Sequence, residues 1–133
     1  MKKSVGSIIS SENNEMPITT KDVEERMIVL RQQPILLDCD VAALYGVRTK
    51  EINQAVRNNP NKFPPAYLFL LSDEEKGEVV KIFDRLSNLK YSAVSPTAFT
   101  ERGLYMLATI LKSATLVALI THNWREAQWL EYQ

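Results

Sequence analysis

Amide and cationic side chains gather in one stretch of the chain, between residues 48 and 62. The candidate DNA contacts in this stretch are Arg48, Thr49, Lys50, Asn53, Gln54, Arg57, Asn58 and Lys62. Asn and Gln amides pair with adenine edges and Arg pairs with guanine, whereas Lys and Thr bind phosphates. These residue types therefore indicate binding to double-stranded DNA. The alternative is an ordinary solvated helix face, because most exposed Lys and Arg side chains have no specific partner.

Two short helical patterns that meet at Gly46 would position these side chains. The small side chain of Ala42 allows two helices to cross closely, and glycine tolerates the positive φ that the turn requires. Ile52 then fills the angle between the helices. This pattern predicts a helix-turn-helix whose second helix, Thr49 to Asn58, enters the major groove. The alternative is a pair of short helices that only closes a small core.

The charges of the chain are balanced overall but separated along the sequence. The formal net charge is zero, which argues against a strongly basic nucleic-acid binder. Between residues 45 and 65, however, four cations accompany one anion, a local net charge of +3. Residues 72–78 are acidic. A DNA-binding surface must therefore be local and one-sided.

The cysteine count and the positions of the apolar runs indicate where in the cell the protein is located. The single cysteine, Cys39, excludes an intrachain disulfide and indicates the cytoplasm. No sustained apolar run occurs in the first 26 residues, which argues against a secretory signal. The apolar region from Gly103 to Ile120 is interrupted by polar residues and would be a poor membrane span. We expect a cytoplasmic protein that has no membrane partner.

Residues 1–17 are polar and are predicted to be a disordered tail, and residues 18–133 to be a single domain. Thr19 or Thr20 is expected to cap a short helical turn. The apolar runs 27–30 and 35–37 predict a β-hairpin, although no glycine supports a tight turn between them. Asp38 or Asp40 is expected to cap the first helix of the helix-turn-helix.

The second half of the chain predicts one strand followed by helices, and then another strand followed by helices. A strand at 67–71 precedes a capping box at Ser72, which opens a helix to about residue 86. A loop at 87–91 leads to a strand at 93–99, in which Pro96 indicates an edge or a bend. Thr100 caps the next helix, and a last helix covers 115–132. The resulting fold class is α+β: a small single domain with short β-hairpins and a helix-turn-helix, closed by C-terminal helices.

No pattern of catalytic or metal-binding residues is recognisable. Asp38 and Asp40 lack a histidine or further carboxylate at a useful spacing, so capping is the preferred interpretation. Cys39 and the single histidine, His122, are interpreted as packing or surface residues. We expect no enzyme activity, no cofactor and no metal.

Two ordered blocks of sequence resemble a known family. They are "PILLDCDVAALYGVRTKEINQAVRNNPNKFPPAYLFLLSDEE" and "SPTAFTERGLYMLATILKS". They are similar to the ORF-six amino-terminal domain, of the KilA-N and Bro-N group of DNA-binding domains found in phages, large DNA viruses and bacterial genomes. The resemblance covers about residues 27–113 and is carried by motifs such as Ala43 to Val47 and Phe99 to Glu101.

The resemblance implies a KilA-N-like DNA-binding domain, with transcription regulation as its role and phage antirepressor proteins as its common setting. Its proposed reading helix falls on Thr49 to Asn58. Two departures stand out: the reading helix lacks a second basic residue at its end, and the sequence after Ser113 follows the family pattern only loosely.

Partner expectations follow from both arguments. The first expected partner is double-stranded DNA, and we expect a homodimer to bind it. The alternative is a protein-interaction module of the antirepressor type, which binds a repressor or another protein. Trp124 and Trp129 lie five residues apart on the last helix, so one of them is expected to point outward and mark an interface.

Overall fold

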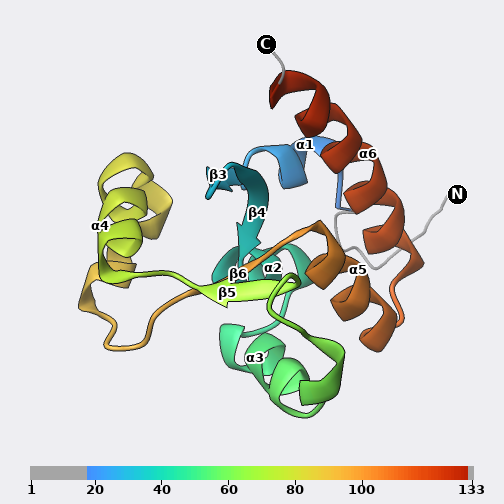
Figure 1. Cartoon of the computed structure of the whole chain (residues 1–133), viewed down its shortest axis with the longest axis horizontal. Coiled ribbons are helices and arrows are strands. Elements are labelled where there is room, and N and C mark those ends of the chain that lie inside the picture. The colour runs from blue at the N-terminus through green and yellow to red at the C-terminus, as the bar shows by residue number, and fades with distance from the viewer. Residues whose placement is uncertain (1–17, 132–133) are drawn as a thin grey trace, which may run out of the picture.

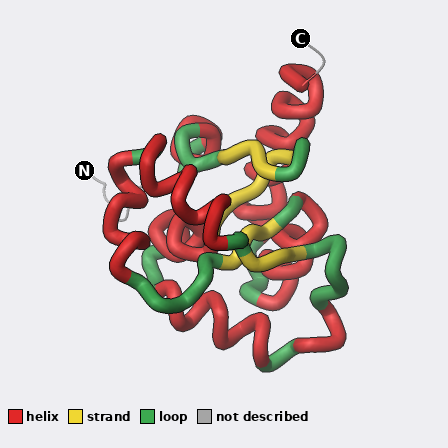
Figure 2. The backbone as a smooth tube through the Cα atoms, turned by 60° about the vertical axis from the view of Figure 1, so that its left-hand side comes forward, coloured by secondary structure: helices red, strands yellow, loops and turns green. Residues whose placement is uncertain are grey.

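The computed structural model describes residues 18–131, and side chains are described as far as residue 126. The predicted tail at residues 1–17 therefore lies outside the described residues. A short antiparallel sheet lies at the centre, with α4 on one side of it and α5 and α6 on the other (Figure 1). The tube in Figure 2 shows how little of the backbone is strand and how the last turns of α6 extend beyond the rest of the chain. The fold is α+β, as predicted, in one small domain.

The first elements are a short helix and a hairpin. Helix α1 (Thr20–Glu24) begins with a capping box between Thr19 and Asp22. Strands β3 (Ile28–Leu30) and β4 (Gln33–Leu37) pair antiparallel, with Ile28 opposite Ile35. The two residues between the strands, Arg31 and Gln32, both have positive φ, 53° and 65°. Two consecutive left-handed residues match the right-handed twist of a hairpin, so the turn forms without glycine.

Next come the two helices at Gly46. Helix α2 (Asp38–Tyr45) ends at Gly46, whose φ of 74° is left-handed, and α3 (Thr49–Arg57) follows after two further residues. The 3-10 helix η1 (Pro60–Lys62) and strand β5 (Leu68–Leu70) follow. The sheet order is β3-β4-β6-β5, so β6 (Thr97–Phe99) lies between β4 and β5. The strand predicted at 93–99 begins only at Thr97, and residues 93 and 94 before it form a bend. Of the two alternatives for Pro96, the edge strand was wrong, because β6 is an inner strand.

Between β5 and β6 the chain forms a separate helical unit. Helix α4 (Asp73–Ile82) begins with the predicted capping box between Ser72 and Glu75. It ends four residues earlier than expected, because Phe83 adopts extended angles. The predicted loop at 87–91 belongs instead to a 3-10 helix, η2 (Asp84–Tyr91), which packs on α4. We call α4 and η2 together the acidic lobe.

The C-terminal helices close the core. Helix α5 (Glu101–Ile110) is capped by Thr100, as expected, and α6 (Ala114–Glu131) packs against both α5 and α1. One buried cluster joins α2, α3, α5 and α6 through Ala42, Ile52, Leu107 and Leu116. A second cluster lies beneath the acidic lobe and includes Leu37, Val79 and Leu86. Among the described residues, no helix is long and apolar enough to cross a membrane.

Candidate nucleic-acid interface

The crossing of α2 and α3 forms as the residues at the turn require. The amide of Val47 donates to the carbonyl of Ala42 over 3.0 Å, which closes the end of α2 around Gly46. Ala42 and Ile52 are both almost fully buried, at 3% and 1% exposure. The small residue and the branched residue therefore occupy the predicted positions inside the crossing. One side of α3 is anchored in the core and the other faces solvent.

Helix α2 begins differently from the expectation. Leu37, and neither Asp38 nor Asp40, is the residue before the first turn, and no side chain caps it. Both aspartates lie inside the first turn, buried at 5% and 4% exposure. The prediction that Asp38 or Asp40 caps α2 was therefore wrong. The Asp38 carboxylate instead bonds to Asn53 on α3, and that of Asp40 bonds to Arg85 on η2.

Asp38 connects α2 to α3. One of its carboxylate oxygens accepts a hydrogen bond of 2.8 Å from the Cys39 amide, and the other accepts one of 2.9 Å from the side-chain amide of Asn53. Burial raises the pKa of Asp38, while the bonds from Asn53 and from the backbone of Thr97 act to lower it. We call the Asp38–Asn53 pair the polar clamp.

The polar clamp changes the role expected of Asn53. Asn53 was predicted to face DNA, but its side chain is half-buried and its amide nitrogen is bonded to Asp38. A side chain bound in this way orients the helix, because a bond from a buried carboxylate fixes the rotation of α3 about its axis. The sequence offered one clue, the placement of an aspartate directly after a fully apolar strand.

The exposed side of α3 carries most of the other candidates. Lys50, Gln54, Arg57 and Asn58 are exposed, and Thr49 is half-buried. Gln54 accepts a hydrogen bond of 3.0 Å from Arg57 and donates one of 2.8 Å to Asn58. All three of these groups are on the surface, so base edges can replace their mutual bonds at little cost. The structure thus brings three predicted residues together as one hydrogen-bonding row.

The cations around α3 differ in how strongly they are neutralised. Arg48 lies 3.7 Å from Glu51, in an exposed pair, and Glu51 also accepts a hydrogen bond from the Arg48 amide. Lys50, Arg57 and Lys62 form no ion pair with any residue in the described part of the chain. Lys62 lies on η1, which packs against α3. The positive charge predicted from the sequence is therefore exposed and largely uncompensated.

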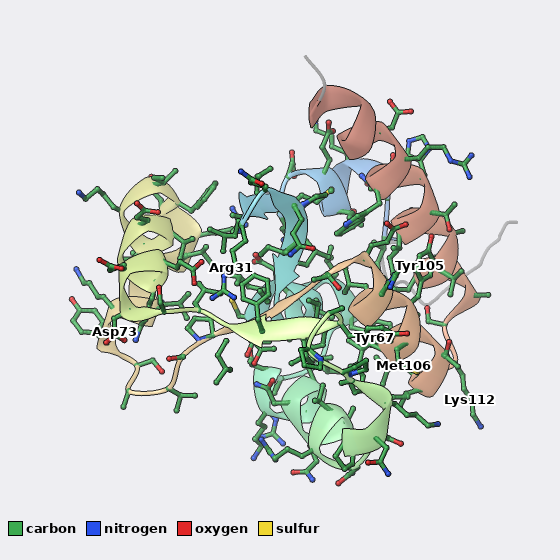
Figure 3. All side chains as sticks on the ribbon, viewed as in Figure 1. Arg31, Tyr67, Asp73, Tyr105, Met106 and Lys112 are labelled. Atoms are coloured by element: carbon green, nitrogen blue, oxygen red, sulfur yellow. The ribbon has the colours of Figure 1, made fainter. Side chains whose placement is uncertain are left out.

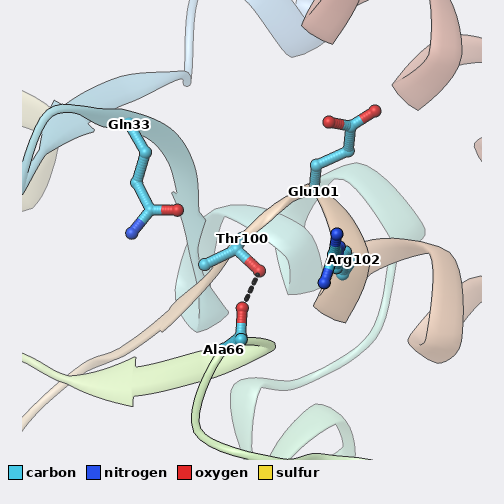
Figure 4. A pocket seen from close by; sticks show the side chains of 5 residues that line it. All are labelled: Gln33, Ala66, Thr100, Glu101 and Arg102. Atoms are coloured by element: carbon cyan, nitrogen blue, oxygen red, sulfur yellow. Dashed lines mark hydrogen bonds between the residues drawn. The ribbon is translucent and has the colours of Figure 1, made fainter.

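The loop that follows α3 is held by the second sequence block. The Thr100 hydroxyl donates to the carbonyl of Ala66 over 2.8 Å (Figure 4). It also donates to the carbonyl of Tyr67 over 3.0 Å, and the Thr100 amide donates to the same carbonyl. A Cβ at Gly103 would lie 1.9 Å from the Tyr67 carbonyl oxygen, so only glycine allows this approach. We call these contacts the loop clasp. A shallow pocket beside it is lined by residues including Gln33, Glu101 and Arg102.

Three further features singled out from the sequence are possible metal ligands, Cys39 and the two tryptophans. Among residues 18–126, where side chains are described, no group of three His, Cys, Asp or Glu residues could hold a metal ion. Burial raises the pKa of Cys39 to about 12, which makes its thiol a poor nucleophile. Trp124 is buried and donates to the Pro34 carbonyl over 3.1 Å, so it is a core residue. The side chain of Trp129 lies outside the described residues.

Comparison with known families agrees with the sequence blocks quoted above. The model of the ORF6N domain matches residues 25–110, which is more than half of the chain and close to the stretch expected. No curated protein matches at the threshold applied, and no solved structure does. The matched region runs from the start of the hairpin to the end of α5 and includes the polar clamp and the loop clasp. The chain therefore belongs to the ORF6N domain family.

Proposed function

We propose that this domain binds double-stranded DNA as part of a phage-type transcription regulator. In this proposal α2 and α3 act as a helix-turn-helix, and α3 enters the major groove. The observation that carries it is the exposed row of Gln54, Arg57 and Asn58, flanked by Lys50 and Lys62, which form no ion pair with any described residue. Family membership supports the same regulatory setting.

The side chains divide into three roles under this proposal. Gln54 and Arg57 read bases, because an amide can pair with adenine and a guanidinium with guanine. Lys50, Lys62 and Arg48 bind phosphates, and Thr49 and Asn58 add contacts at the two ends of α3. Asn53 has no base to read; through the polar clamp it sets the angle at which α3 presents its neighbours. Nothing in this arrangement requires a cofactor, a metal or a catalytic step.

Salt-dependent binding to duplex DNA tests the proposal. The chain is titrated into a labelled pool of random duplex at several salt concentrations, beside Lys50→Ala and Arg57→Ala. Affinity should fall steeply with salt, and each substitution should lower the salt slope by roughly one. Lys81→Gln is the matched control, because Lys81 is an exposed lysine on α4, in the acidic lobe. Binding that ignores salt and both α3 substitutions would overturn the proposal.

A second candidate function rests on the acidic lobe. Ile82 and Tyr91 are 68% and 79% exposed there, and Val94 just beyond it is 73% exposed. Exposed apolar side chains of this size favour a protein-binding surface, as an antirepressor would need. Binding of a repressor by a chain that does not bind duplex at low salt would favour this function over the first.

The homodimer stays a prediction. One of its two supporting residues, Trp124, is buried in the core and cannot contact a second copy. Sedimentation of the chain with and without a selected duplex would measure the number of copies bound. A single copy at saturating concentration would exclude the dimer.

A further inference from the structure

The turn between α5 and α6 carries an unusual lysine. Lys112 has a φ of 57°, in the left-handed region, and its side chain is exposed. Its amide donates to the carbonyl of Thr109, and the Ser113 amide donates to that of Ala108. These two bonds end a helix in the way that usually places glycine at the left-handed position. A lysine there is strained by about 1 kcal/mol relative to glycine.

The turn that carries Lys112 is bonded to the end of α2. The Tyr45 hydroxyl, at the end of α2, donates to the Leu111 carbonyl over 3.3 Å. This bond ties the residue before Lys112 to the helix that ends at Gly46, and α5 also contacts α3. In Figure 3 the Lys112 side chain lies at the lower right, beyond the end of α5, and α3 lies at the lower centre of the same view. The turn therefore places the Lys112 cation close to the end of α2, the first of the two proposed DNA-binding helices.

The charge of Lys112 has no structural use that requires lysine. It forms no ion pair with any residue between 18 and 126. Its interaction with the dipole at the end of α5 is worth about 0.3–1 kcal/mol, which at most offsets the strain that a glycine would remove. Between residues 18 and 131, the two other residues with left-handed backbone that are not glycine form the hairpin turn, and there Arg31 is bonded to Glu75.

We propose that Lys112 binds a DNA phosphate, so that the α5–α6 turn is a second anchoring point outside the helix-turn-helix. This inference rests on the proposed DNA-binding function. Local strain is retained where a side chain has a function that the strained backbone position serves. The second anchor would fix the orientation of the whole domain on the duplex, since contacts at α3 alone would let the domain pivot about that helix.

Three substitutions at Lys112 test the inference in the full chain. Lys112→Gln keeps the backbone strain and removes the charge, so duplex affinity should fall roughly three- to tenfold and the salt slope by about one. Lys112→Arg should retain the affinity. Lys112→Gly should raise the melting temperature while it lowers duplex affinity. A residue with only a structural role would not move stability and affinity in opposite directions.

The controls separate this inference from the function on which it rests. Lys81→Gln should leave both affinity and slope unchanged. If Arg57→Ala weakens binding and Lys112→Gln does not, the second anchor is overturned and the proposed function stands. If the unsubstituted chain binds no duplex at low salt, both are overturned.

Discussion

Helix α3 and the acidic lobe differ in how their cationic side chains are partnered. Two ion pairs join the lobe to other elements: Arg85 of η2 meets Asp40 of α2 over 2.9 Å, and Arg31 of the hairpin turn meets Glu75 of α4 over 2.9 Å. Around α3, the buried Asp38 carboxylate is bonded to a neutral amide, that of Asn53, and the cations of Lys50 and Arg57 are left in solvent. Paired arginines hold elements together, whereas unpaired cations remain available for a partner outside the chain.

The two paired arginines in turn differ in burial. Asp40 is almost fully buried, and Arg85 also donates to the Arg26 carbonyl, so this pair links α2, η2 and the segment after α1. Arg31 is exposed and lies over the Phe69 ring at 3.9 Å. Because Asp40 is buried, removing its partner Arg85 leaves a desolvated charge without compensation. Breaking the Arg85–Asp40 pair should therefore cost more free energy of unfolding than breaking the Arg31–Glu75 pair.

The largest effect should come from Arg85→Ala. It leaves the Asp40 carboxylate buried without its partner, and we expect a loss of about 2–3 kcal/mol in the free energy of unfolding. Urea denaturation measures this loss. Duplex affinity of the folded variant should stay within twofold of the original, because Arg85 lies in the acidic lobe. A matching loss of affinity would show that the two regions are coupled.

Asn53→Ala should have an intermediate effect on stability. It removes one of the donors to the buried Asp38 carboxylate, and we expect a loss of about 1–2 kcal/mol. Duplex affinity should fall as well, since α3 loses the bond that fixes its rotation. Gln54→Ala, one position along, is the comparison variant. Equal losses of stability for the two substitutions would refute the polar clamp.

Gln54→Ala should change recognition with little change in stability. Gln54 is exposed and its two partners are exposed, so the unfolding free energy should change by less than about 0.5 kcal/mol. Discrimination at one base pair of a selected site should drop by roughly 1–3 kcal/mol. Selection from a random duplex pool with each protein measures it. An unchanged preferred sequence would remove Gln54 from the set of base readers.

The smallest effect should be the acid sensitivity of the hairpin. The Arg31 guanidinium, together with the Ser72 amide, lowers the pKa of Glu75 to about 2. A carboxylate whose folded pKa is lowered stabilises the fold above its unfolded pKa, and this stabilisation is lost as pH falls from about 4.5 toward 2. Because the Arg31–Glu75 pair is largely in water, Glu75→Gln should only slightly reduce the pH dependence of the free energy of unfolding in this range. A steeper curve for Glu75→Gln would contradict the assignment.

Local signals in the sequence predicted the elements that local chemistry determines. Gly46, the capping box at Ser72 and the cap at Thr100 all lie where their patterns placed them. Of the two threonines expected to cap the first helix, Thr19 is the one that does. A cap or a left-handed turn depends on three or four consecutive residues, so a single sequence is enough to recognise it.

What the sequence missed depends on contacts between distant residues. Asp38 looks like a cap until Asn53, fifteen positions later, is brought beside it. The early end of α4 at Phe83 and the 3-10 helix that follows reflect packing over the second cluster, into which Phe83 and Leu86 are drawn. Lys112 has an ordinary sequence context, and only its backbone angle distinguishes it.

The loop clasp has a consequence for the order in which this chain can fold. Thr100 holds carbonyls that lie 33 and 34 positions earlier, across the whole acidic lobe. During synthesis, residues 49–67 leave the ribosome well before the threonine that secures them. The segment proposed to touch DNA thus gains the hydrogen bonds from Thr100 only after most of the domain has been made. A fragment that ends before residue 100 would lack these bonds.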